Sequence, residues 1–222
     1  MIEQLLTDLA TLGKAATVRR YEKNGEPKPY FGVSMADISK MAKKYQGQDL
    51  SFKDLWLTGN LDAQLVAIQL FKPNDLAEDE IALALQPNVS VLVLDKFCDK
   101  ILAKRSDAAQ WQEQLLKSDE DRLVRLGWGL RLRQVIAKQL PETEVESLLT
   151  EIEAKLGQAL PYTKWNMNRT MVEIALHYPD FRPRVLAAAQ KIGAYQDMKV
   201  AKGCTSAYAP DWIAAVLRRQ EK

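Results

Sequence analysis

The sequence has little of what metal sites and nucleophilic enzymes need. Its 222 residues include one histidine, His177, and two cysteines, Cys98 and Cys204. With a single histidine we expect neither a common zinc site nor a Ser-His or Cys-His nucleophile. The two cysteines are far apart and unlike a disulfide framework, so a reducing cytoplasm is the expected location. No glycine-rich loop suited to phosphate is present. We therefore expect no cofactor and no metal.

Long apolar runs and a strong net charge are also absent. No stretch approaches the roughly 18 apolar residues that a membrane helix needs. Residues 2–14, IEQLLTDLATLGK, are amphipathic and lack the apolar centre of a signal peptide. The net charge of +2 does not identify a partner. It does not exclude nucleic acid either, because a DNA site needs only one basic face.

Helical periodicity runs through almost the whole chain. Apolar residues recur at helical spacing, and no segment alternates as a half-buried strand would. The clearest segments are 1–12, 35–45, 61–71, 80–86, 121–140, 145–160, 169–178, 181–195 and 211–220. Ser34, and Ser118 with Asp121 three residues on, have the character of helix starts. The pattern predicts ten to twelve short paired helices: an all-α protein with one HEAT-like solenoid domain over residues 1–222.

Residues 89–105, VSVLVLDKFCDKILAKR, place Asp95 and Asp99 four positions apart. On an α-helix both carboxylates then lie on one face. Like charges so placed weaken the helix slightly, and a half-buried carboxylate needs a partner. The pair could be a structural ion-pair network with nearby cations, or it could do chemistry.

Several motifs occur together in a distinctive order. They are FGVSMADISKMAKKY at 31–45, LWLTGNLDAQLVAIQLF at 55–71, WQEQLLKSDEDRLVRLGW at 111–128, and the tail with AAAQKIGAYQDMKVAKGC and APDWI. In this order they resemble the AlkD-like DNA alkylation repair proteins, from about residue 30 to residue 213. The resemblance implies a helical solenoid of HEAT-like repeats whose concave, basic face holds duplex DNA. Solenoids of this size are usually stable alone, so we expect a monomer.

The resemblance also implies an activity. The family's active members are monofunctional glycosylases that release N3- or N7-alkylated purines without extruding the base. They use an Asp four residues after a Trp, an Arg on the following helices and a second Trp near the C-terminus. A cationic purine already leaves readily, so the carboxylate's task is to stabilise an oxocarbenium-like sugar. Aromatic rings would hold the cationic nucleoside.

The family's residues map only partly onto this sequence. The acid is Asp95 or Asp99, and the preceding Trp position then falls on Val91 or on Asp95 itself. The arginine maps to Arg125. The second Trp falls at Asn168-Arg169, with Trp165 one turn earlier. The predicted DNA contacts are Lys96, Lys100, Arg122, Arg125, Arg131, Lys164, Trp165 and Arg169.

Three functions remain open at this point. One is an alkylpurine glycosylase with Asp95 or Asp99 as electrostatic catalyst. The second is a non-catalytic solenoid that binds duplex, damaged or branched DNA. The third is a HEAT-type scaffold for a protein partner. The acid and the arginine favour the first function, and the missing tryptophans favour the second.

Overall fold

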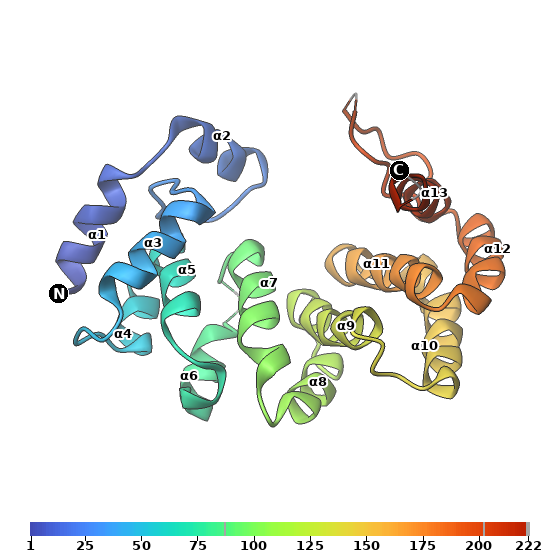
Figure 1. Ribbon diagram of the computed structural model, residues 1–222, viewed down its shortest axis with the longest axis horizontal. Helices are drawn as coiled ribbons and strands as arrows, with labels where there is room; N and C mark the ends of the chain where they lie inside the picture. Colours follow the sequence, from blue (N-terminus) through green and yellow to red (C-terminus); the bar gives the residue numbers. More distant parts are fainter. Residues whose placement is uncertain (87, 202, 221–222) are drawn as a thin grey trace. The chain divides into compact units, whose positions relative to one another are not determined.

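The predicted helical periodicity is realised throughout the computed structural model, which describes residues 1–86, 88–201 and 203–220. Over these residues every regular element is helical, so the all-α class is confirmed. The α-helices are α1 (Ile2–Thr11), α2 (Ala15–Lys23), α3 (Met35–Tyr45), α4 (Phe52–Leu57), α5 (Leu61–Leu70), α6 (Glu78–Ala84), α7 (Val91–Lys100), α8 (Ala108–Leu116), α9 (Asp121–Ile136), α10 (Glu142–Lys155), α11 (Pro161–His177), α12 (Arg182–Ile192) and α13 (Ala209–Gln220) (Figure 1). Four 3₁₀ helices are η1 (Pro73–Asp75), η2 (Leu102–Lys104), η3 (Leu156–Gln158) and η4 (Pro179–Phe181).

The described residues thus hold slightly more α-helices than the predicted ten to twelve. Apolar periodicity did not single out α2, because its sequence AATVRRYEK is mostly polar, and α4 has only six residues. The helix expected from Arg169 begins earlier, at Pro161. Proline suits a first helical position, where its missing N–H is not needed. The four residues Pro87, Lys202, Glu221 and Lys222, of which Lys202 falls within the tail motif, lie outside the described residues.

The chain divides into two compact units, Met1–Trp111 and Gln112–Lys222. The expectation of one continuous domain stays a prediction. In the first unit α5 packs against both α3 and α7 (Figure 1). Its residues from Leu61 to Ile68 are all buried, which explains why this segment is apolar on every side. Phe52 stacks on Trp56 at 4.9 Å between ring centroids, and Phe97 of α7 lies 5.6 Å from the same indole.

A buried carboxylate joins two of the sequence motifs in this unit. Asp62, in the first turn of α5, is fully buried. It accepts hydrogen bonds from the backbone N–H groups of Phe31 (2.6 Å), Gly32 (2.9 Å) and Val33 (3.1 Å). The Tyr21 hydroxyl donates to it at 3.3 Å. Burial and the nearby carboxylate raise the pKa of Tyr21, so the hydroxyl keeps its proton and stays a donor.

Gly32 is needed at this junction for two reasons. Its φ of +81° lies in the left-handed region that residues with a side chain avoid. A Cβ atom here would also lie 2.5 Å from Cγ2 of Val18. The Gly-Val pair of the first motif and the acid of the second therefore form one structural joint.

The two predicted serine caps have different outcomes. Ser34 is the N-cap of α3, as predicted, and its hydroxyl accepts a hydrogen bond from the Asp37 N–H. The prediction for Ser118 was wrong. Helix α9 begins at Asp121 with Glu120 as its N-cap, and the Ser118 hydroxyl accepts from the Glu120 N–H in the preceding turn. Asp121 instead caps another helix.

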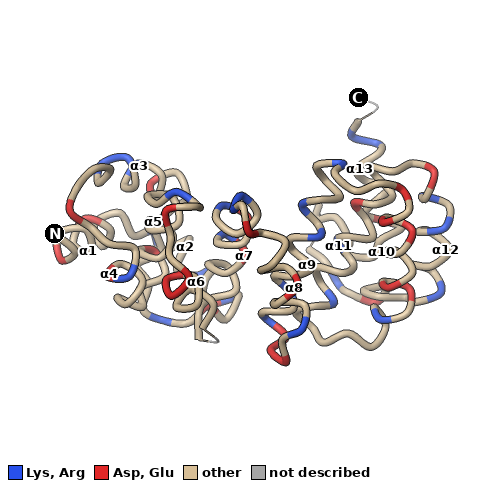
Figure 2. Tube along the Cα trace, turned by 90° about the horizontal axis from the view of Figure 1, so that it is seen from below, with Lys and Arg blue, Asp and Glu red and all other residues tan. Residues whose placement is uncertain are grey.

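The second unit is built on α9 and α11, the most extensively packed helix pair in the described structure. Its buried core includes Trp128 of α9 and Met171 of α11. Gly127 lets α9 approach α8 closely, since a Cβ there would lie 2.7 Å from Cγ of Leu116. Basic and acidic residues are interspersed along the helices of both units, so neither unit carries charge of only one sign (Figure 2). No helix among the described residues is long and apolar enough to cross a bilayer.

We expect Asp62→Ala to lower the free energy of unfolding by more than about 3 kcal/mol, because it leaves three backbone donors without their acceptor. Urea denaturation followed by circular dichroism measures this. Asp54→Ala is the matched control, since Asp54 also lies in a first helical turn but is exposed. Equal stability of the two variants would contradict the role given to Asp62.

Candidate nucleic-acid interface

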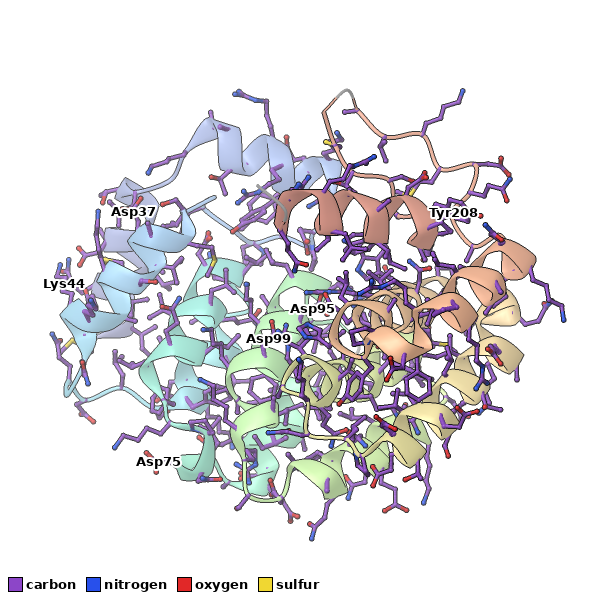
Figure 3. The ribbon with its side chains drawn as sticks, turned by 45° about the vertical axis from the view of Figure 1, so that its right-hand side comes forward. Asp37, Lys44, Asp75, Asp95, Asp99 and Tyr208 are labelled. Atoms are coloured by element: carbon purple, nitrogen blue, oxygen red, sulfur yellow. The ribbon has the colours of Figure 1, made fainter. Side chains whose placement is uncertain are left out.

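Asp95 and Asp99 lie on α7 one turn apart, as the sequence predicted (Figure 3). Both side chains are half-buried, while Leu94 and Cys98 of the same helix are buried in the core. Asp95 and Asp99 each interact with another group in the structure. A half-buried charge needs such an interaction. The two acids thus lie on one side of α7, next to its buried face.

Lys96 and Lys100 line a cavity of about 260 Å³ on the first unit. They lie on one face of α7, turned by about 100° from the acids because adjacent helical residues are separated by that angle. The other lining residues come from α3 and α5: Met35, Ser39, Leu65, Ile68 and Gln69. Helix α7 therefore presents its predicted cations and its predicted acids on adjacent faces.

In the second unit, Asp121 fixes the start of α11. Its two carboxylate oxygens accept hydrogen bonds from the N–H groups of Tyr162 and Thr163, each at 2.8 Å. These donors belong to the first turn of α11, where no carbonyl within the helix can accept from them. The carboxylate also suits the positive end of the helix dipole. A residue of α9 thereby caps its neighbour.

Arg122 and Arg125 of α9 both contact this end of α11. The Arg125 side chain is 8% exposed and donates from Nη1 to the Tyr162 carbonyl at 3.3 Å. The backbone carbonyl of Arg125 accepts from Nδ2 of Asn166 at 2.8 Å. The Arg122 guanidinium lies over the Tyr162 ring, 5.2 Å from its centroid. The two predicted arginines are therefore brought together around Tyr162.

One face of α11 carries aromatic and basic residues in alternation. Tyr162, Trp165 and Arg169 stand at positions i, i+3 and i+7, a spacing that places them along one side of a helix. Tyr162 is exposed, and Trp165 and Arg169 are half-buried. With Arg122 and Arg125 from α9, these residues form what we call the α11 stripe.

Two aromatic residues from the C-terminal segment meet the stripe at Trp165. The Tyr195 ring contacts the Trp165 indole edge to face, with centroids 5.8 Å apart, and Trp212 of α13 lies 6.2 Å away. Burial raises the pKa of Tyr195; the charge of Arg125 opposes this shift and that of Asp121 adds to it. Tyr195 therefore lies within electrostatic reach of the α9–α11 junction.

Two predicted DNA contacts lie away from the stripe. Arg131 is turned by about 180° around α9 from Arg122, at 100° per residue. It donates to Glu151 of α10 at 2.6 Å and lies 4.7 Å from the Trp128 ring centroid. Lys164 donates to the Gly157 carbonyl at 3.1 Å. In the structure both side chains donate hydrogen bonds to residues of the second unit. That either of them contacts DNA stays a prediction.

Sequence reasoning passed over Tyr162, Tyr195 and Trp212 as members of this surface. Tyr162 could have been found, because its spacing to Trp165 and Arg169 is visible once a helix is drawn from Pro161. Tyr195 follows Trp165 by 30 positions and lies outside any helix, so only the fold brings the two rings together. Among the described residues, no group of three or more His, Cys, Asp or Glu side chains is placed to hold a metal ion.

Comparison with known proteins decides the family. A model of the family described as DNA alkylation repair enzymes matches residues 2–213. The chain belongs to this family. The resemblance of the sequence motifs is thereby confirmed. No curated protein sequence matches the chain significantly.

The fold of this DNA alkylation repair family member has a solved counterpart. That structure is described as a new family of proteins related to the HEAT-like repeat DNA glycosylases with affinity for branched DNA structures. The match has a TM-score of 0.79 at 20% identity and covers 99% of this chain and 94% of the other. At this identity the likeness establishes the fold, a HEAT-like helical repeat.

We expect Asp121→Ala to destabilise this family member by about 0.5–2 kcal/mol, the usual effect of removing a helix cap. The two N–H groups at the start of α11 would lose their acceptor. Asp119→Ala, an exposed acid two residues earlier, is the control. Urea denaturation measures both variants. If Asp119→Ala is as destabilising as Asp121→Ala, capping is not the role of Asp121.

Proposed function

We propose that this protein binds DNA and releases N3- or N7-alkylated purines from it. Membership of the DNA alkylation repair enzyme family is the observation that carries the proposal. Two features of the chain support it. One is the pair of carboxylates one turn apart on α7, and the other is the stripe of arginines and aromatic rings on α9 and α11. We further propose that it acts as a monomer in the cytoplasm on double-stranded DNA, without a cofactor.

In this proposal a carboxylate of α7 supplies the chemistry. An alkylated purine carries a positive charge and is a good leaving group, so loss of the base leaves positive charge on the sugar. A fixed carboxylate, Asp95 or Asp99, would stabilise that charge, and water would add to the sugar carbon. Arg122 and Arg125 would contact phosphates, which fixes the position of the DNA without reading its sequence.

A second candidate function is binding of branched DNA without base release. Two observations favour it. The position of the family's first tryptophan is Val91 if Asp95 is the acid, so the ring that would hold the alkylated nucleoside on α7 is missing. The solved relative is described as having affinity for branched DNA. Both candidates use the same DNA-binding stripe, and they differ in whether the α7 acids act on the sugar.

The decisive experiment is base release from duplex DNA treated with a methylating agent. We expect release of methylated purine by the wild type, and a loss of about 100-fold or more in either Asp95→Asn or Asp99→Asn. The substitution removes the charge and keeps the size of the side chain. The variant that leaves activity intact serves as the control for the other. Absence of release by the wild type, with DNA binding retained, would favour the second candidate.

The arginines of the stripe are tested by the salt dependence of duplex binding. Arg122→Gln and Arg125→Gln should each reduce the slope of log affinity against log salt concentration by about 0.9, the value for one phosphate contact. Fluorescence anisotropy over a salt series measures the slope. Lys117→Gln removes an exposed cation at the end of α8 that pairs with Glu113, and should leave the slope unchanged. Equal slopes in all four proteins would remove the stripe from the DNA interface.

A further inference from the structure

The aromatic residues that meet the α11 stripe form a surface distinct from the core of the second unit. Trp128, a core aromatic, is 3% exposed. Trp165, Tyr195 and Trp212 remain half-buried, and Tyr162 is 37% exposed. Exposing several aromatic rings side by side is costly in water, so such groups commonly mark a binding surface. Arginines flank these rings, and this combination is typical of nucleic-acid sites.

The rings of Trp165 and Tyr195 do not stack on each other. They meet edge to face, with an interplanar angle of 80°. In such a contact one ring presents its edge, so its two faces are not covered by the other ring. Trp212 is tilted by 45° to Trp165 and packs against the core of the unit.

The backbone at Tyr195 is unusual and directs its side chain to this position. Its φ of +62° lies in the left-handed region, which is rare for a bulky residue. Such conformations persist only where surrounding contacts stabilise them, and they cluster at functional sites. The contact with Trp165 is the interaction that this conformation makes possible.

The charges around the rings identify the class of ligand. Arg122 lies over Tyr162, and Arg125 is close enough to Tyr195 to influence its pKa. Arg169 lies one turn beyond Trp165 on the same face of α11, and its buried Nε has no hydrogen-bond partner among the described residues. Planar rings beside cations suit a planar base attached to phosphates.

We propose that Trp165 and Tyr195 form a stacking platform for an unpaired DNA base, with the arginines of the α11 stripe contacting the adjoining phosphates. In an intact duplex both faces of each base are covered by its neighbours, and only edges reach a protein surface. A base at a bulge, flap or branch point has a free face. The platform therefore selects DNA that contains an unstacked base over fully paired duplex. This inference rests on the proposed DNA binding and specifies which DNA is preferred.

The test compares two DNA probes of the same length, one a fully paired duplex and one with a single bulged 2-aminopurine. Wild-type protein should bind the bulged probe more tightly and quench its 2-aminopurine fluorescence, because the base stacks on an indole ring. Trp165→Ala should weaken binding of the bulged probe by about 5- to 150-fold, the usual loss for one base–aromatic stack. It should weaken binding of the paired duplex less, because the bases of a paired duplex offer no free face to stack on the ring.

Three further variants test the need for each ring and control for unrelated effects. Trp165→Phe retains a ring and should preserve most of the preference for the bulged probe. Tyr195→Ala removes the second ring of the platform and should reduce the preference and the quenching. Leu160→Ala truncates an apolar side chain, 59% exposed, next to the start of α11 and should change neither. Circular dichroism checks that each variant remains helical.

The outcomes separate this inference from the proposed function. Equal affinity of the wild type for both probes, or equal losses on both probes in Trp165→Ala, would overturn the stacking platform and leave the proposed DNA binding standing. Failure of the wild type to bind either probe at low salt would overturn both. A preference for the bulged probe that disappears in Trp165→Ala and returns in Trp165→Phe would establish the platform.

Discussion

The structure depends on a recurring constraint, the need to satisfy backbone N–H groups where the chain turns into a buried helix. In the first unit Asp62 meets it by accepting hydrogen bonds from three consecutive N–H groups of the segment before α3. In the second unit Asp121 meets it at the start of α11. Water cannot reach the buried donors around Asp62, so the carboxylate there is a structural requirement. Asp62 lies in the second of the sequence motifs and Asp121 in the third.

One of these acids lies beside the candidate functional residues. Asp121 caps α11 at Tyr162 and Thr163. Trp165, on the same helix, meets Tyr195 and Trp212. Arg125 contributes from α9 by donating to the Tyr162 carbonyl. Because Arg125 contacts α11 in the structure and DNA in the proposed function, stability must be measured alongside affinity in its variants.

The fold could be predicted from the sequence because helical periodicity is a local property. Ser34 was identified correctly for the same reason, since a cap acts within its own turn. Ser118 was misjudged because Asp121, three residues on, had the spacing of a cap partner, while its carboxylate is engaged by a helix 40 residues away. Tyr195 could not have been predicted, because its ring meets Trp165 through a loop whose path depends on the whole second unit. Contacts within one helical turn can be predicted from a sequence, whereas contacts between segments far apart in the chain depend on the fold.

In the proposed function, the chemistry and the DNA binding belong to different parts of this chain. The acids that could stabilise a developing sugar cation lie on α7 in the first unit, and the aromatic rings and arginines of the stripe lie in the second. The α7 helix begins with Val91, where the family's active members place a ring if Asp95 is the acid. The printed contacts of the stripe join residues of α9, α11 and the C-terminal segment of the second unit. Base release and DNA binding therefore have to be measured separately, since neither predicts the other.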